Sequence, residues 1–336
     1  MNSERTGSRL RAGDLVVVRT PLEILTTLDS NGTLDNLPFM PEMLEYCGNT
    51  FRVSSVVVQA SIDGAFLGCH TESFVREFKH NDVVTLQGLR CSGKEHDACQ
   101  RNCSIFWKQA WLKKVADHDN VSVPDGESIG GAAELRAMMK TKTDPSSYFC
   151  QSSEFLKATL NLSSAQRFEK CFSAVAAGNI SAWAMTKRIV LWMVWKARTR
   201  LIGEHGRGPL EKTPTEVLNL QPGELVQVKS LGEIIETLDS NGRNRGLHFS
   251  GDQRRFCGGT YRVRSRADNF IAEGTGEMKH FRNTVMLEDV LCDSAYFAFG
   301  GCYRADMLYW REIWLRRADP SLSTNTSEIE QVCLTN

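Results

Sequence analysis

Short apolar runs bounded by turn residues predict β-rich structure at both ends of the chain. The turn Gly13-Asp14 precedes the run at 15–18, and Gly223-Glu224 precedes a similar run at 225–228. Runs of four to eight residues rich in valine and isoleucine, with glycine or proline at their borders, are typical of strands. The same criterion predicts further strands at 56–60, 83–89 and 285–291.

This pattern occurs twice. The hexapeptide Thr-Leu-Asp-Ser-Asn-Gly stands at 27–32 and again at 237–242, and many residues around it are identical at the same offset of 210. A second shared block, at an offset of 203, pairs Trp107 and Trp111 with Trp310 and Trp314. Self-similarity at a fixed spacing indicates a duplicated module. A chain of 336 residues is long enough to give each copy its own core.

The predicted fold class is α+β, with two homologous small β-rich modules and a helical insert between them. The Gly-acidic turn that leads into a valine-rich strand resembles the start of SH3-like barrels. The predicted organisation is a disordered start (1–12), module 1 (13–116), a linker (117–147), a helical insert (148–209), module 2 (210–318) and a disordered tail (319–336).

The repeated hexapeptide admits two interpretations. Its alternating Asp and Asn residues resemble a calcium loop, but glycine is missing at the sixth place and glutamate at the twelfth. The second copy also has Arg245 where the first has Asp35. We therefore favour a short helix at 21–28 that ends at Asn31-Gly32, because glycine adopts the left-handed conformation easily.

The repeated tryptophans are expected in the core rather than on a ligand-stacking surface, because large aromatic residues dominate small cores. Trp107 and Trp111 would share one face of a helix, or Trp111 would begin a last strand.

The segment 180–202 is predicted to be the most basic and most apolar helix of the chain. It carries three tryptophans and five cations, and its middle, 189–195, is apolar all round. Such a helix favours burial between the modules or against a protein or carrier partner. A peripheral position at the inner membrane surface is the alternative, with the cations facing anionic headgroups.

Charge and composition narrow the function further. Lysine plus arginine and aspartate plus glutamate both number 40, so the balance disfavours nucleic acid as a partner. The polar first 13 residues and the lack of a long uncharged apolar run lead us to expect a cytoplasmic protein. Eleven cysteines in a reducing compartment suggest metal ligands, reactive thiols or small core residues rather than disulfides.

The cysteines form two related constellations. Module 1 contains Cys47, Cys91, Cys99 and Cys103. The first three correspond to Cys257, Cys292 and Cys302 in module 2, and Asp306 occupies the position that corresponds to Cys103. Four thiolates suit a closed structural zinc site. The other interpretation is that these cysteines are small buried apolar residues.

The second constellation lacks a fourth ligand, for which the candidates are Cys150, Asp306 and His280. An open position would instead suit a catalytic metal or an iron centre. Cys69, Cys171 and Cys333 have no counterparts, and His70, His96 and His118 are expected to be exposed loop residues. Arg52 and Arg262 follow a shared turn, where they either bind an anion or face solvent.

The common catalytic motifs are absent. The chain has no phosphate-binding Gly-x-x-x-x-Gly-Lys-Ser/Thr, no dinucleotide-binding Gly-x-Gly-x-x-Gly, no Gly-x-Ser-x-Gly and no His-Glu-x-x-His. The sequence therefore leans away from an enzyme.

The elements shared by the two copies resemble a family of uncharacterised bacterial proteins often encoded near surface-polysaccharide or natural-product biosynthesis genes. The resemblance rests on Gly-Asp/Glu-Leu-Val, Glu-Ile-x-x-Thr-Leu-Asp-x-Asn-Gly, Cys-Gly-x-Thr-Phe/Tyr-Arg-Val, Trp-Lys/Arg-x-x-Trp-Leu and Tyr148-Phe149-Cys150-Gln151. It implies an accessory role in a biosynthetic pathway and no specific activity.

Two functional hypotheses follow. The first is a tandem module, stabilised by a metal for which zinc is the expected ion, that binds a partner without catalysing a reaction. The second is a metalloenzyme or iron-dependent redox protein that uses an open cysteine-ligated site in module 2.

Overall fold

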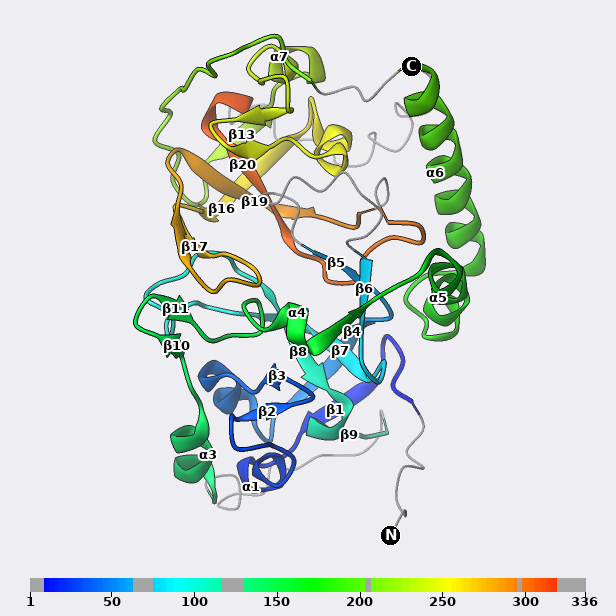
Figure 1. Cartoon of the computed structure of the whole chain (residues 1–336), viewed down its shortest axis with the longest axis vertical. Coiled ribbons are helices and arrows are strands. Elements are labelled where there is room, and N and C mark those ends of the chain that lie inside the picture. The colour runs from blue at the N-terminus through cyan, green and yellow to red at the C-terminus, as the bar shows by residue number, and fades with distance from the viewer. Residues whose placement is uncertain (1–8, 63–74, 117–129, 203–206, 295–297, 319–336) are drawn as a thin grey trace.

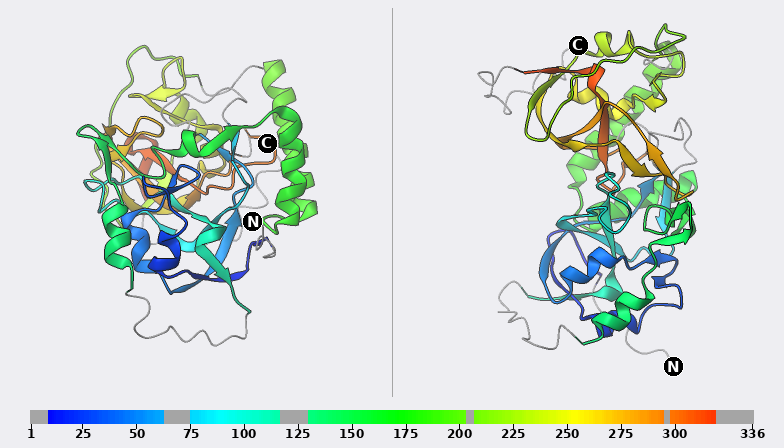
Figure 2. Two further views of the ribbon diagram at one scale, coloured as in Figure 1. Left: turned by 60° about the horizontal axis from the view of Figure 1, so that its bottom comes forward. Right: turned by 90° about the vertical axis from the view of Figure 1, so that its left-hand side faces the viewer.

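The fold contains two similar five-stranded antiparallel sheets, one above the other in Figure 1 and seen from two further sides in Figure 2. This computed structural model describes residues 9–62, 75–116, 130–202, 207–294 and 298–318. The predicted tail 319–336, residues 1–8 of the predicted disordered start and residues 117–129 of the predicted linker lie outside this range. The α+β class and the internal duplication are confirmed at this level.

The two sheets have the same strand order. In module 1 the order is β8-β7-β4-β1-β9, formed by β1 (Leu15–Val18), β4 (Thr50–Val56), β7 (Val83–Arg90), β8 (Ser104–Lys108) and β9 (Leu112–Lys114). In module 2 the order is β20-β19-β16-β13-β21, formed by β13 (Leu225–Val228), β16 (Thr260–Arg266), β19 (Thr284–Leu291), β20 (Met307–Arg311) and β21 (Leu315–Arg317).

Most strand predictions are confirmed, since β1, β7, β13 and β19 cover the expected runs. The strand predicted at 56–60 is wrong, because β4 ends at Val56 and the chain turns before β5 (Ala60–Ser61). β5 joins a separate sheet with β6 (Val75–Phe78) and β12 (Thr159–Asn161). The matching hairpin of module 2 consists of β17 (Asn269–Ile271) and β18 (Met278–His280).

The repeated hexapeptide forms a turn after a short helix, as predicted. The helices α1 (Pro21–Leu25) and α7 (Leu231–Ile235) each begin with a capping box, in which a hydroxyl and a glutamate pair with the opposite backbone N–H groups. Asp29 Oδ1 then accepts the N–H groups of Asn31 and Thr33, at 2.9 and 3.0 Å. Gly32 has φ 73°, which a residue with a side chain rarely adopts.

Short paired segments follow each turn. These are β2 (Thr33–Leu34) with β3 (Leu37–Pro38) in module 1 and β14 (Arg243–Asn244) with β15 (Leu247–His248) in module 2. A 3₁₀ helix comes next in each module, η1 (Pro41–Tyr46) or η5 (Gly251–Phe256), and another precedes each last strand, η3 (Gln109–Trp111) or η6 (Glu312–Trp314).

The four repeated tryptophans are fully buried, which confirms that they belong to the core. They lie on β8, η3, β20 and η6 rather than on one helix. Trp111 Nε1 donates to Thr27 Oγ1 at 3.1 Å, and Trp314 Nε1 makes the same bond to Thr237 at 3.0 Å. The hexapeptide therefore recurs partly because its first residue anchors a core tryptophan in each module.

The segment between the modules is closely joined to module 1. Its elements are α3 (Ala132–Met138), β10 (Lys142–Asp144), β11 (Ser147–Tyr148), α4 (Phe155–Ala158), β12, α5 (Ser164–Ala176) and α6 (Ala182–Ile202). α3 packs against α1, and β12 pairs with β6. Phe155 and Cys171 belong to the same apolar core as the tryptophans of module 1, as does Leu10 at the start of the chain.

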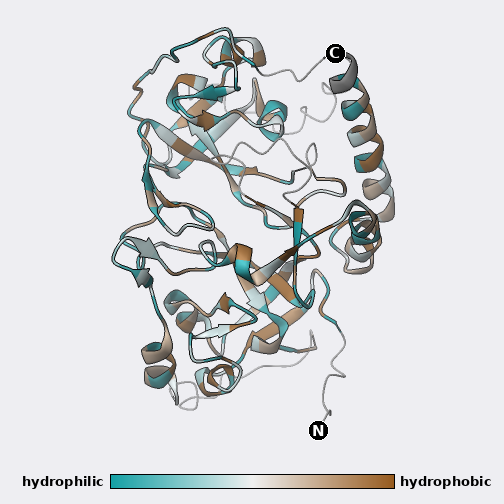
Figure 3. Cartoon of the chain, viewed as in Figure 1, coloured by the Kyte–Doolittle hydropathy of each residue, from teal (hydrophilic) through white to brown (hydrophobic). Residues whose placement is uncertain are grey.

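Helix α6 lies along the outer side of the molecule, so the prediction that it is buried between the modules is wrong (Figure 1). Met185 faces inward, whereas Trp183, Leu191 and Val194 are each more than 60% exposed. Apolar and polar positions alternate along the helix in Figure 3. No helix in the described ranges is long and apolar enough to cross a bilayer.

The modules hold each other through reciprocal contacts. The N–H of Ile271 in β17 donates to Cys99 Sγ at 3.4 Å, and the N–H of Ser61 in β5 donates to Cys302 Sγ at 3.3 Å. Cys99 and Cys302 are equivalent in the repeat, as are Ser61 and Ile271. Each hairpin thus contacts the loop of the other module that carries this cysteine. We call this the cysteine loop; it joins β7 to β8 in module 1 and β19 to β20 in module 2.

Two buried arginines extend this symmetry. Arg101 donates to the carbonyl of Ile271 at 3.0 Å, and Arg304 donates to the carbonyl of Ser61 at 2.9 Å. Both also bind Glu273, and all three side chains are only 2% exposed. The module interface therefore contains a buried Arg-Glu-Arg triad.

Candidate metal centre in the first module

The loop between β7 and β8 brings most of the module 1 cysteines together. The N–H of Cys91 donates to the carbonyl of Cys103 at 2.9 Å, which closes the loop at its base. Gly93 makes the compact path possible, because a Cβ atom there would lie 1.8 Å from the carbonyl oxygen of Cys99. Cys91, Cys99 and Cys103 consequently line one cavity.

The intervening segment completes this cavity. Cys150 and Gln151 line it beside the three loop cysteines, His96 and the buried arginines Arg101 and Arg304. Its volume is about 20 Å³. Such a space holds one water molecule or one metal ion, whereas an iron–sulfur cluster of several atoms requires considerably more.

Two of the residues that line the cavity, Cys91 and His96, lie close to a third potential ligand, Glu42. Within the described residues, Glu42, Cys91 and His96 are the group whose carboxylate, thiol and imidazole atoms all lie within 4.8 Å of one another. Glu42 belongs to η1, and the other two belong to the cysteine loop. The Cys91 thiol donates to Glu42 Oε1 at 2.9 Å.

Two of these side chains carry a buried polar atom that makes no hydrogen bond to any described residue. They are Glu42 Oε2 and His96 Nδ1, and the two residues are 9% and 1% exposed. His96 Nε2 lies 3.2 Å from the carbonyl of Phe149, so Nε2 must be the donor in that bond. In the neutral ring Nδ1 then keeps its lone pair, which is the form that ligates a metal.

Three of the thiols around the cavity, those of Cys91, Cys103 and Cys150, are held in their neutral form. Burial, and next the negative charge of Glu42, raise the pKa of Cys91 well above the ordinary value. Burial raises the pKa of Cys150 to about 11 and also raises that of Cys103. A divalent cation would reverse this effect, because the thiolate is the form that binds a metal.

The structure revises the ligand set predicted from the sequence. Cys47 does not line the cavity, since it follows η1 and its sulfur lies 4.0 Å from the carbonyl of Met43. Cys150 occupies the cavity of module 1, not module 2. His96 is buried rather than exposed, and Glu42 was missed. The acid at Asp252, 210 residues after Glu42, is the signal that could have revealed Glu42.

Module 2 retains only part of this arrangement. The Cys292 thiol donates to Asp252 at 3.3 Å, as Cys91 does to Glu42. Phe299, three residues before Cys302, stands where His96 stands three residues before Cys99. Cys257 repeats the position of Cys47, with its sulfur 3.9 Å from the carbonyl of Gln253. Within the described part of module 2, no three ligand atoms come together as they do in module 1.

The proposed fourth ligands of module 2 lie elsewhere. Asp306 forms an ion pair with Arg304 at 3.0 Å, and His280 Nδ1 lies 2.7 Å from Asn269 Oδ1. Cys171 is buried on α5, and the remaining cysteines and histidines considered from the sequence, Cys69, Cys333, His70 and His118, lie outside the described residues.

The repeated arginines have a structural contact. Arg52 and Arg262 donate to the carbonyls of Gly13 and Gly223, at 3.1 and 2.7 Å. Each guanidinium therefore braces the turn that opens its module.

Comparison of this chain with protein-family models, with curated proteins and with solved structures gives no match. Its function must therefore be argued from the site itself.

Proposed function

We propose that this chain is a tandem-module binding protein whose first module is stabilised by one metal ion. Glu42, Cys91 and His96 would hold the ion, together with a thiol of Cys103 or Cys150. The observation that carries this proposal is the pair of buried ligand atoms, Glu42 Oε2 and His96 Nδ1, that make no hydrogen bond among the described residues. Leaving such atoms unpaired costs about 1–3 kcal/mol each, which a bound cation would offset.

The ligand types favour zinc. A mixture of thiolate, imidazole and carboxylate in a closed site is typical of Zn²⁺, which prefers four ligands in a tetrahedron. Cys103 and Cys150 line the same cavity as Cys91 and His96, so one of these two thiols would be the fourth ligand. A single iron ion is the alternative metal, while the cavity volume of about 20 Å³ disfavours a cluster.

The metal would have a mechanical role. Glu42 comes from η1, Cys91 and His96 from the cysteine loop, and Cys150 from the intervening segment. One ion bound among them would connect three parts of the chain that are distant in sequence. Because the ion would lie among buried side chains in a cavity of about 20 Å³, a structural role is favoured over catalysis.

The wider role follows from the architecture. The five-stranded order with a 3₁₀ helix before the last strand supports the SH3-like interpretation of each module, with the helical insert between them. We infer that the exposed apolar side chains of α6 contact a protein or carrier partner. The resemblance to bacterial biosynthesis-associated proteins suggests an accessory role in the cytoplasm, where thiolate ligands stay reduced. The alternative, a metalloenzyme centred on module 2, has fewer gathered ligands to support it.

Metal analysis of the purified protein tests the proposal. We expect one zinc ion per chain, and we expect Cys91→Ser and His96→Ala to reduce it to a small fraction. Cys257→Ser is the matched control, because this thiol is also partly buried but lies outside the cavity. Chelation should lower the Tm of the wild type and of the control. A protein purified without stoichiometric metal, or variants that keep it, would contradict the proposal.

A further inference from the structure

Each module buries a cation at the end of its outer strand, and module 1 neutralises that charge. Lys108, the last residue of β8, has a side chain that is only 1% exposed. Its ammonium lies 2.8 Å from Asp35 Oδ2 and 2.9 Å from Asp82 Oδ1. Two carboxylates therefore compensate one buried charge, as a buried cation requires.

Module 2 buries a larger cation at the same place. Arg311, the last residue of β20, is 5% exposed. Its guanidinium donates to the carbonyls of Asn244, Arg245 and Arg282 and to Thr284 Oγ1, over distances of 2.6 to 3.2 Å. These acceptors are neutral. No carboxylate of the described residues forms an ion pair with Arg311.

Both carboxylates of module 1 are replaced. Arg245 stands 210 residues after Asp35, and both have left-handed backbones, with φ 46° and 55°. Asn283 corresponds to Asp82, since the carbonyl of each accepts the N–H of the residue that follows the buried cation. A cation, Arg245, thus stands in module 2 in place of Asp35, and an uncharged amide, Asn283, stands in place of Asp82. Burial, and next the charge of Arg245, lower the pKa of Arg311 to about 10.

A pocket of about 570 Å³ opens beside this uncompensated charge. Part of its polar lining comes from Arg245, Arg282, Arg311 and His280, and part of its apolar lining from Phe281 and Ile313. Glu216 is the one carboxylate among the lining residues, and it pairs with Lys229 at 3.0 Å. The pocket therefore has a marked excess of positive charge.

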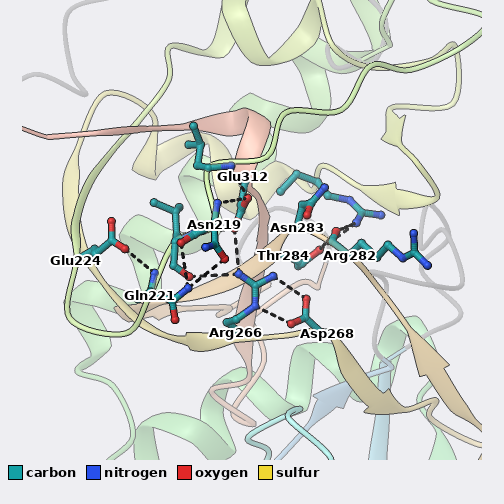
Figure 4. A network of polar contacts seen from close by, with 12 residues as sticks. Asn219, Gln221, Glu224, Arg266, Asp268, Arg282, Asn283, Thr284 and Glu312 are labelled. Carbon is teal, nitrogen blue, oxygen red and sulfur yellow. Dashed lines mark hydrogen bonds and ion pairs between the residues drawn. The ribbon is translucent and has the colours of Figure 1, made fainter.

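The pocket is built on a fixed frame. Glu312, which follows Arg311, is fully buried and accepts the N–H groups of Leu218, Asn219 and Leu220 at 2.7 to 3.0 Å. Arg266 reinforces it at 3.2 Å (Figure 4). This network holds the segment that supplies Glu216 and Val217 to the pocket wall. Figure 4 also shows Arg282, Asn283 and Thr284 following one another beside the network.

We propose that this pocket binds a small organic anion through a carboxylate or phosphate group. The anion would take the place that Asp35 and Asp82 occupy in module 1, with Arg245 and Arg282 at the entrance and Arg311 at the base. Arg245 and Arg282 would bind the carboxylate or phosphate oxygens, because the N–H groups of a guanidinium form a planar fork that matches them. Arg311 already donates four hydrogen bonds to the protein and would contribute mainly its positive charge. Phe281 and Ile313 would contact the apolar part of the ligand.

Thermal unfolding in the presence of simple anions tests this site. Inorganic phosphate and succinate are titrated separately against the full chain, with sodium chloride holding the ionic strength constant. We expect a saturable rise in Tm with one of them, and the effective probe distinguishes a phosphate from a carboxylate ligand. No saturable rise with either anion would overturn the proposal.

The decisive variant is Arg245→Asp, which restores one of the two carboxylates of module 1. It should raise the Tm without any added anion and abolish the rise that the anion causes. Arg264→Asp is the matched control, since it changes the charge equally at an exposed position outside the pocket. Arg282→Ala keeps the backbone carbonyl that binds Arg311 and should weaken anion binding at least fivefold. Anion responses equal to that of the wild type in both pocket variants would overturn the proposal.

Discussion

The two modules have the same backbone fold but differ in the side chains that surround their buried polar groups. Their strand order, capping boxes, hexapeptide turns and tryptophan anchors are the same. Yet His96 faces the cavity in one module where Phe299 stands in the other. Lys108 pairs with two carboxylates, whereas Arg311 pairs with none among the residues that the structure describes. Residues common to both copies maintain the fold, and residues that differ mark the candidate sites.

A third difference shows how the intervening segment came to belong to module 1. In module 2, Gln253 of η5 donates to the carbonyl of Tyr309 at 2.9 Å and accepts the N–H of Ser250 at 2.7 Å. Module 1 has Met43 at that position, which cannot donate. Gln151 instead enters from the intervening segment and binds both backbone groups of Phe106, the counterpart of Tyr309, at 2.8 Å.

The largest expected effect comes from the contact that both modules share. Glu273→Gln would remove the buried carboxylate that Arg101 and Arg304 share, and removing one partner of a buried ion pair typically costs about 3–5 kcal/mol. Urea unfolding measures the loss. Glu277→Gln, whose side chain is half exposed and pairs with Lys279, should change stability by less than about 0.5 kcal/mol. Equal effects of the two changes would contradict the buried triad.

A smaller effect is expected from the two glutamines that bind the equivalent strands β8 and β20. Gln151→Ala should destabilise the protein by about 2–3 kcal/mol, because it leaves buried backbone groups unpaired. Gln253→Ala removes fewer bonds and should cost about 1–2 kcal/mol. Adding Met43→Gln to Gln151→Ala should recover part of the loss, since it gives module 1 the glutamine of module 2. Denaturant unfolding of the wild type and these three variants decides whether a glutamine at position 43 can replace Gln151.

The smallest effect depends on pH. Burial opposes ionisation of Asp35, but the hydrogen bond and charge of Lys108 outweigh it and lower the pKa of Asp35. The ion pair therefore stabilises the fold above the unfolded-state pKa of about 3.9, and this contribution disappears as the pH falls below it. Asp35→Asn should cost about 1–2 kcal/mol at pH 7 and progressively less below pH 4. The exposed Glu288→Gln is the control for losing one charge, and a pH-independent difference would contradict the prediction.

The sequence predicted the parts of the fold that depend on local pattern. Valine-rich runs identified β1 and β13, and the helix stop at Gly32 follows from its left-handed backbone. The burial of the tryptophans was also predictable, because the same pair recurs in both modules and large aromatic residues dominate small cores. These features require only neighbours along the chain and the duplication.

The candidate metal centre was only partly predictable, because it is assembled from three distant segments. Recurrence favoured Cys47, yet Cys47 and Cys257 hold equivalent places after a 3₁₀ helix and outside the cavity. The absence of a counterpart in module 2 led us to discount His96, although it is buried beside Cys91. Cys150 reaches the cavity because its neighbour Gln151 binds the backbone of Phe106 in β8. The spacing of apolar residues in the sequence does not indicate such a long-range hydrogen bond.

The reciprocal seating of β5 on Cys302 and of β17 on Cys99 has a consequence for the origin of the chain. A contact in which each half offers the other the same surface is the isologous geometry of a two-fold homodimer. A single half-length ancestor could therefore have paired with itself through this surface, and gene fusion would have made the pair permanent. Once fused, the halves were free to diverge, so that one could acquire a buried histidine while the other lost its carboxylates.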